Sequence, residues 1–197
     1  MTMSISDYRR KRDLAKSGEP RGSSGSSGKN PIFVIQKHDA STLHYDFRLE
    51  VNGVLKSWAV PKGPSTDPSE KRLAIETEDH PLEYAEFEGT IPKEEYGGGT
   101  VLIWDRGTYE NITRKDGDRR PMDEALASGH ALFRLKGEKL AGGYALQRID
   151  DDKGHWLLVK MDDDEADARR NPVSTEPESV VSGRTLEEIA DGKKDSS

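Results

Sequence analysis

The stretch LHYDFRLEVNGVLKSWAV, residues 43–60, has the pattern of a two-stranded hairpin. Apolar and polar side chains alternate over residues 43–51 and again over 54–60, which is the period of a strand with one buried face. Asn52-Gly53 separates the two runs, and this pair favours the two-residue turn in which both residues adopt positive φ. The sequence therefore predicts two antiparallel strands in direct succession, 43–51 and 54–60.

Further strand-like runs surround this hairpin, separated by glycine and proline turn signals. They cover residues 32–36, 72–78, 100–105, 130–135, 143–149 and 155–161. One helix is expected over 121–128, with Pro121 in its first turn and Gly129 just past its end. Eight short strands with few helices predict a mainly β protein, either a closed barrel of about eight strands with a few short flanking helices or a sandwich.

The 197 residues allow one domain with long tails. Residues 1–31 read as a basic arm that ends in a Gly/Ser linker, with one short helix expected at 6–16. Residues 32–161 form the predicted β domain. Residues 162–197 are acidic and polar, and we expect a loosely ordered tail there.

Composition excludes several classes of protein. The chain has no cysteine, which rules out disulfides, zinc–thiolate sites and a cysteine nucleophile. Its net charge of −7 argues against a protein that coats nucleic acid through a broad basic face. The mean hydropathy is −0.86, no apolar run is long enough for a membrane helix, and no signal segment follows Met1. A soluble, cytoplasmic protein is expected.

The polar face of the 43–51 strand carries an unusual set of side chains. The opposite, core-facing set is Leu43, Tyr45, Phe47 and Leu49. His44, Asp46 and Arg48 share the polar face, where a solvated strand would favour Thr, Lys, Glu and Ser. An imidazole, a carboxylate and a guanidinium in a row indicate a site for a metal or a phosphate.

His38 precedes this strand by the turn-forming Asp39-Ala40-Ser41, and we expect it to fold back beside His44. Two imidazoles and one carboxylate make a three-ligand site that suits Mn²⁺, Zn²⁺, Fe²⁺ or Co²⁺. Arg48 adds a two-pronged donor for phosphate, so the set is typical of phosphoryl transfer. The pattern alone leaves a metal or phosphate site and a structural role equally open.

The segment 72–84, RLAIETEDHPLEY, is the second strand with reactive groups. Strict alternation predicts one face made of Arg72, Ala74, Glu76, Glu78 and His80. His80 could act as a general acid or hydrogen-bond a phosphate oxygen, because its unperturbed pKa of about 6.5 allows either role. Lys56 and Lys62 are further candidates for phosphate contacts.

Other features favour ordinary structural roles. Gly97-Gly98-Gly99 lacks the Lys-Ser/Thr pair that completes a phosphate-binding loop, so we expect a turn. Three tryptophans lie in predicted strands, and we expect them in the core rather than stacked on bases: Trp58, Trp104 and Trp156.

Three stretches resemble the phosphoesterase domain of bacterial and archaeal DNA ligase D. They are FVIQKHDASTLHYDFRLEVNGVLKSWAVPKGPS (33–65), RLAIETEDHPLEYAEFEGTIPKEEYGGGTVLIWDRGTYE (72–110) and the later GYALQRI and HWLLVK. The core His-x5-His-Tyr-Asp-Phe-Arg is highly specific. The arm sequence YRRKRD and the segment PESVVSGRTLEEIA (177–190) also resemble the flanks of this domain in larger ligases.

The resemblance implies a β-barrel with an active-site groove on its outer surface. It implies a Mn²⁺-dependent hydrolase, with Co²⁺ or Zn²⁺ as other candidate metals. The enzyme would remove a 3′-terminal ribonucleoside and then the 3′-phosphate, leaving a 3′-OH for repair by non-homologous end joining. Its expected substrates are DNA or RNA–DNA primer 3′ ends, its expected partners a ligase or polymerase and an end-binding protein, and a monomer is expected.

The resemblance also assigns residues by motif. His38, His44 and Asp46 match the metal ligands, and Arg48, His80 and Tyr84 match the catalytic residues. The matches for substrate handling are Gln36, Lys62, Arg72 and Glu78, with Asp13 and Glu19 in the arm. These two acidic residues imply that the arm docks near the site.

Two rival functions stay open. A non-catalytic module could bind DNA ends and recruit ligase or polymerase, although a scaffold needs no in-phase row of metal ligands and arginine. A small-molecule phosphatase could use the same site. The chain contains no polymerase or ligase sequence, so we expect either a stand-alone version of the domain or an excised piece.

Overall fold

The hairpin predicted from residues 43–60 forms the strands β2 (Leu43–Val51) and β3 (Val54–Val60). Val51 and Val54 are paired across the turn. Asn52 and Gly53 have φ angles of 52° and 84°, as the two-residue turn requires.

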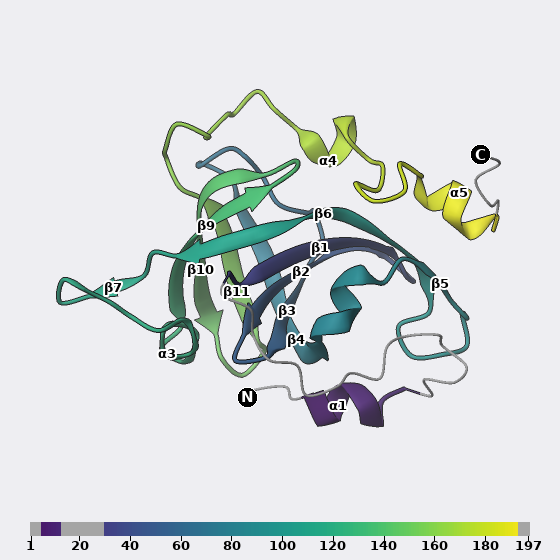
Figure 1. Cartoon of the computed structure of the whole chain (residues 1–197), viewed down its shortest axis with the longest axis horizontal. Helices are drawn as coiled ribbons and strands as arrows, with labels where there is room; N and C mark the ends of the chain where they lie inside the picture. Colours follow the sequence, from purple (N-terminus) through teal and green to yellow (C-terminus); the bar gives the residue numbers. More distant parts are fainter. Residues whose placement is uncertain (1–4, 13–29, 193–197) are drawn as a thin grey trace.

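The computed structural model describes residues 5–12 and 30–192 (Figure 1). The other strands are β1 (Ile32–Asp39), β4 (Lys71–Pro81), β5 (Gly89–Ile91), β6 (Gly99–Asn111), β7 (Arg114–Lys115), β8 (Asp118–Arg119), β9 (His130–Gly137), β10 (Ala141–Asp150) and β11 (His155–Lys160). The helices are α1 (Ile5–Arg10), the 3₁₀ helix η1 (Leu82–Glu86), α3 (Met122–Ala127), α4 (Pro172–Thr175) and α5 (Leu186–Ala190).

The strands close into an antiparallel barrel. The hydrogen-bonded order is β1-β2-β3-β4-β11-β10-β9-β6, and β6 returns to pair with β1 from Ile32↔Thr108 to Asp39↔Thr100. The closed barrel of eight strands is therefore confirmed, and the sandwich is excluded. The short strand β5 lies outside the ring and pairs with the start of β6.

Aromatic side chains fill the barrel interior. Trp58, Trp104 and Trp156 are all buried in this core, together with Phe47 and Phe133. Trp58 and Trp156 meet edge-on with ring centres 5.7 Å apart, and Phe47 stacks on Phe133 at 5.8 Å. The expected core position of the tryptophans is confirmed.

A second apolar cluster covers part of the outer wall. Val34, Leu55 and Ile103 project from β1, β3 and β6 and pack against Tyr84 of η1 and Tyr8 of α1. This strip of wall has hydrophobic residues on both faces, which is why period-two alternation fails to describe all of it. Figure 1 shows η1 and α1 lying beside β3 and β4.

Two details differ from the sequence-based expectation, and a third agrees with it. Leu43 begins the predicted core face of β2 but is 42% exposed, because it lies at the open end of the strand. The expected helix at 6–16 starts at Ile5 and ends at Arg10, and residues 13–16 lie outside the described residues. The helix expected at 121–128 is α3.

The acidic segment after β11 lies against the barrel. Its composition had suggested a loosely ordered tail. Trp104 donates its indole N–H to the carbonyl of Glu176 at 2.8 Å, and the Val180 amide donates to the carbonyl of Ile103 at 2.9 Å. Leu186 and Ile189 of α5 pack against the core cluster. Backbone groups make most of these contacts, so the segment's polar side chains do not prevent docking.

Within residues 5–12 and 30–192, no helix has both the length and the apolar character needed to cross a bilayer.

Candidate metal centre and phosphate-binding groove

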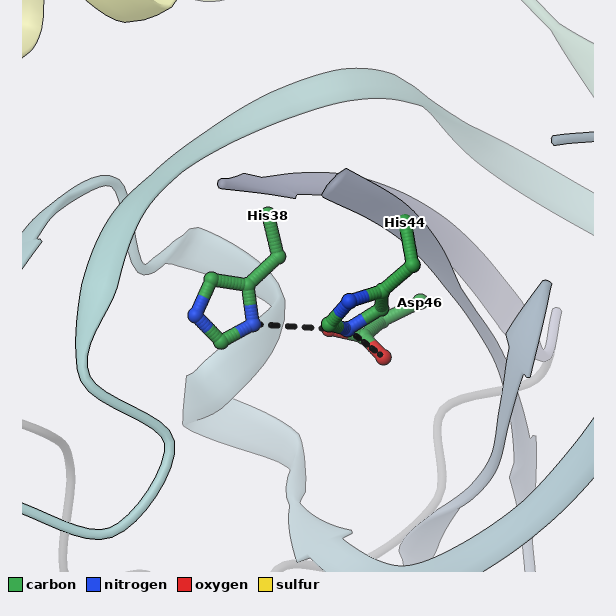
Figure 2. Close-up of side chains that lie close together, drawn as sticks. All are labelled: His38, His44 and Asp46. Atoms are coloured by element: carbon green, nitrogen blue, oxygen red, sulfur yellow. Dashed lines mark ion pairs between the residues drawn. The ribbon is translucent and has the colours of Figure 1, made fainter. Parts of the chain in front are cut away.

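The β1–β2 hairpin places two histidines directly opposite each other. His38 is the register partner of His44, and Gln36 is the partner of Asp46. Because alternate residues share a face, His38, His44 and Asp46 all project from the outer side of the wall. Figure 2 shows the two imidazoles and the carboxylate pointing toward one another.

The three side chains form a group that could hold a metal ion. One ligand atom from each residue lies within 4.8 Å of the others, and it is the one such group found in the described part of the chain. Asp46 Oδ1 is 3.1 Å from His44 Nε2, and Asp46 Oδ2 is 3.4 Å from His38 Nδ1 (Figure 2). Two imidazole nitrogens and a carboxylate fit a borderline divalent cation.

Asp46 is held in the ionised state that a metal ligand needs. Burial alone would raise its pKa, but the charge of Arg48 and hydrogen bonds from His38 and His44 hold the pKa well below its usual range. For His44, burial opposes the charged form, while Asp46 outweighs it and raises the pKa. His44 Nδ1 lies 3.1 Å from the carbonyl oxygen of Thr42, an acceptor that orients the ring and directs Nε2 to Asp46.

Arg48 lies next to this group on the same face and is 3% exposed. Its Nε donates to Gln36 Oε1 at 2.7 Å, and its Nη2 is 3.5 Å from Asp46 Oδ2. Gln36 is fully buried and also donates to the carbonyls of Tyr84 and Phe87 at 2.7 and 3.0 Å. Gln36 therefore links the Arg48 side chain to the backbone of η1 and of Phe87 through hydrogen bonds. Gln36 itself does not line the groove.

A β-bulge brings His80 to the same groove. Leu55 pairs with His80 but Ser57 pairs with Thr77, so β4 has one extra residue between these pairs. The bulge turns Glu78 and His80 to the outer face. Glu76 stays inside, where its carboxylate accepts the indole N–H of Trp156 at 3.0 Å.

The expected common face of β4 is therefore wrong. Ala74 and Glu76 face the interior, while Glu78 and His80 line the groove with His38, His44 and Asp46. The bulge explains why the even-numbered residues of β4 face the interior up to Glu76 and the outer side from Glu78 onward.

Two arginines flank the His80 ring. Arg48 Nη1 is 3.1 Å from Nδ1, and Arg12 Nη2 is 3.3 Å from Nε2. Burial, followed by the charges of Arg48 and Arg12, lowers the pKa of His80 well below its usual value. His80 is thus a neutral imidazole at neutral pH.

Tyr84 packs against both groups. Its ring lies edge-on to His80 at 4.7 Å, and the Arg48 guanidinium lies 4.9 Å from the ring centre. Tyr84 is 2% exposed and lines the groove. The ring thereby excludes water from one side of Arg48, which strengthens that residue's interaction with an anion.

The arm contributes residues that the motif reading missed. Arg12 lines the groove and pairs with Glu78 at 2.8 Å, and Lys11 lies 3.6 Å from the same carboxylate. Tyr8 is fully buried, with its ring centre 4.8 Å from that of His80. The available signals were the basic run YRRKR and the resemblance, which implied an arm docked near the site, but neither of them singled out Arg12.

Other candidate residues lie elsewhere. Lys62 and Arg72 do not line the groove, and Arg72 pairs with Glu70 at 2.9 Å. Lys56 pairs with Asp79 at 3.1 Å in a different cavity. Asp13 and Glu19 lie outside the described residues.

The groove has a volume of about 290 Å³. A larger cavity, of about 500 Å³, lies at one end of the barrel beside α3. Its charged groups are largely paired with one another, as in Lys56–Asp79 and Arg148–Asp151, and it contains no histidine. The smaller groove holds the candidate metal ligands His38, His44 and Asp46, with Arg48 and His80 beside them.

Comparison with known proteins is consistent with this geometry. Residues 36–148 match the family model described as the DNA Ligase D 3′-phosphoesterase domain. The chain is 48% identical over 188 residues to the Multifunctional non-homologous end joining protein LigD of Pseudomonas aeruginosa, covering 92% of this chain and 22% of that protein.

Two further relatives have similar identity. The Multifunctional non-homologous end joining DNA repair protein LigD of Mycobacterium tuberculosis is 46% identical over 158 residues, covering 80% of this chain and 20% of that protein. The LigD protein of Mycolicibacterium smegmatis is 46% identical over 162 residues, covering 81% and 21%. This chain thus spans about a fifth of these relatives' length. With a family match over more than half of its residues and a groove that gathers a metal-ligating group, an arginine and a neutral histidine, the chain belongs to the DNA ligase D 3′-phosphoesterase domain family.

Proposed function

We propose that this chain is a metal-dependent 3′-phosphoesterase that processes nucleic-acid ends in DNA repair by non-homologous end joining. The observation that carries the proposal is the groove itself. It collects the metal-ligating group of His38, His44 and Asp46 beside Arg48 and His80. The printed names of the relatives, which refer to non-homologous end joining, support the repair context.

The proposed reaction has two hydrolytic steps. In the first, water adds to phosphorus and the bond to the 5′-oxygen of the terminal ribonucleoside breaks, which releases that nucleoside and leaves a 3′-phosphate. In the second, water adds again to phosphorus and the bond to the 3′-oxygen breaks. Inorganic phosphate is released, and the strand then ends in a 3′-OH. The strand is then ready for a ligase or polymerase.

Mn²⁺ is the proposed cation, with Co²⁺ and Zn²⁺ as alternatives that the same ligands accept. His38, His44 and Asp46 would hold it, since their donor atoms converge and Asp46 is ionised. When bound, the cation supplies positive charge that polarises a phosphoryl oxygen.

Arg48 has the role of binding the phosphate oxygens. Its Nε is occupied by Gln36, so the guanidinium is fixed and its two terminal nitrogens face the groove between His80 and Asp46. A fixed guanidinium stabilises negative charge that develops on phosphate oxygens without having to reorganise. Tyr84 maintains the low-polarity surroundings of that charge.

His80 supplies a neutral imidazole. A neutral ring has one N–H donor and one acceptor nitrogen. Nδ1 lies 2.9 Å from the Glu78 carbonyl, which accepts the N–H, so Nε2 is the acceptor nitrogen that can take up a proton in the groove. Arg12 and Glu78 support this group from the arm side, because Arg12 contacts both His80 and Glu78. Lys62 is exposed and lies away from the groove, and we assign it contacts with more distant parts of a bound strand. Arg72 also lies away from the groove and pairs with Glu70, so we assign it no contact with the substrate.

A digest of a labelled primer that ends in one ribonucleotide tests the proposal. With Mn²⁺, the wild-type chain should first yield the shortened 3′-phosphate strand and then the 3′-OH strand. His44→Ala and Asp46→Ala should each reduce both products to below about a hundredth, because each removes a proposed ligand. Asp152→Ala, in the exposed turn before β11, is the matched control.

Full activity of His44→Ala would contradict the metal site. If the chain protects the primer end but forms no product in excess Mn²⁺, the result would instead support a non-catalytic module that binds DNA ends. Equal cleavage of a free nucleoside 3′-monophosphate and a 3′-phosphate primer would indicate a small-molecule phosphatase.

A further inference from the structure

Tyr96 is an exposed aromatic residue at the rim of the groove. It lies in the loop between β5 and β6 and lines the same cavity as His44, Asp46 and His80. Of the large apolar side chains that are exposed within the described ranges, Tyr96 is the one aromatic, at 48% exposure. The other tyrosines in this part of the chain are buried, so the exposed ring is an exception in the fold.

The arm fixes the position of this ring. Lys11 Nζ donates to the Tyr96 hydroxyl at 3.4 Å and lies 5.1 Å from the ring centre. The guanidinium carbon of Arg12 is also 5.1 Å from the ring centre. Arg12 in turn contacts His80, so the ring is anchored directly beside the proposed phosphate-binding groups.

The groove continues past Tyr96. A neighbouring cavity of about 490 Å³ shares Ala40 and Gly97 with the metal groove. Its remaining walls are Asp39, Ser41, Lys93, Gly98 and Gly99. Lys93 is an exposed positive charge at the rim of this cavity. This second cavity offers space for a strand that leaves the metal groove beside the Tyr96 ring.

We propose that Tyr96 is a substrate-binding residue that stacks on the base of the nucleotide carrying the scissile phosphate. Every base has a π face, so such stacking tolerates any sequence. It gives the enzyme a preference for nucleic-acid ends over small phosphate esters, since the phosphate contacts alone cannot distinguish the two. This inference rests on the proposed function and names the part of the substrate that the rim of the groove recognises.

The test compares two 3′-phosphorylated DNA strands that differ only in the terminal nucleotide, which carries either a base or a tetrahydrofuran spacer. For the wild type with Mn²⁺, KM should be about tenfold higher for the spacer strand, with kcat little changed, because loss of stacking weakens binding. Tyr96→Leu should give the same KM for both strands. Tyr96→Phe should keep the wild-type ratio, since it retains the ring.

If Tyr96→Leu keeps the wild-type ratio of KM for the spacer strand to KM for the strand with a base, the stacking role is overturned. An equal rise in KM for both strands in Tyr96→Leu would also overturn the stacking role, because a ring that only holds the arm affects all substrates alike. Metal-free binding of the two strands, followed by fluorescence anisotropy, gives the same comparison without catalysis. If the protein binds the strand with a base more tightly but forms no product with metal, the proposed hydrolysis is rejected. The stacking role of Tyr96 is then still supported.

Discussion

His80 shows how folding sets the charge of one side chain at the residue scale. The ring is 3% exposed and lies between the guanidinium groups of Arg48 and Arg12. Burial and both positive charges act in the same direction on its pKa, while the Glu78 carbonyl and Asp46 oppose them only in part. The neutral form is therefore favoured in the folded protein.

This charge state predicts a loss of stability on the acid side. An unfolded histidine takes up a proton near pH 6.5, whereas folded His80 has its pKa well below that value. The stabilising contribution is complete above pH 6.5 and is lost as the pH falls toward the folded pKa, at up to about 1.4 kcal/mol per pH unit. His80→Gln should make the free energy of unfolding, measured by urea denaturation from pH 7.5 to 5, fall less steeply.

His130→Gln is the matched control, because His130 is exposed at the start of β9. The pH slope is compared rather than the stability at one pH, since His80→Gln also removes packing. Identical slopes for the wild type and His80→Gln would show that His80 gains its proton at the same pH in both states.

Individual site residues differ in how far sequence predicts them. His44, Asp46 and Arg48 follow from period two in one strand, and His38 from a short turn, so local geometry brings all four together. Arg12 reaches the groove through the packing of Tyr8 on His80 and Tyr84. Such tertiary contacts over more than sixty residues leave no periodic signal in the sequence.

At the scale of elements, the strands were predicted best. β2 and β3 have the bounds that alternation and Asn52-Gly53 indicated, and all eight barrel strands were found. The β4 bulge could not be predicted, because an extra residue in a ladder depends on the partner strand rather than on local pattern. Its consequence is functional, since it turns Glu78 and His80 outward.

The β1–β6 seam supports the metal centre and depends on Gly99. This glycine has a φ of +134°, and a Cβ there would lie 2.1 Å from the carbonyl oxygen of Asp39, the residue after His38. Gly99→Ala must therefore displace the end of β1. We expect it to lower the free energy of unfolding by more than about 3 kcal/mol, as measured by chemical denaturation.

Gly117→Ala separates this overlap from backbone strain. Gly117 also has a positive φ, +86°, but a Cβ there meets nothing within 4 Å. Its cost should be only the conformational one, about 1–2 kcal/mol. Equal destabilisation by the two variants would contradict the role assigned to the close approach at Gly99.

At the scale of the whole molecule, the barrel serves as the wall on which the groove is built. Its interior is filled with aromatic rings, so the outer face of β1 to β4 carries the chemistry. The arm and η1 cover this face beside the groove, and the acidic segment after β11 packs near β6 (Figure 1). Sequence predicted the barrel, and the family resemblance implied that the arm docks near the site. The docking of the acidic segment was not predicted, because its contacts involve backbone carbonyls and single side chains.

The presence of a divalent cation between His38, His44 and Asp46 is the central claim, and crystals of the full chain soaked in Mn²⁺ test it most directly. An anomalous difference map should show a peak contacting all three residues, and Asp46→Asn should abolish it. A peak at another place in the protein, or one that persists unchanged in Asp46→Asn, would contradict the account.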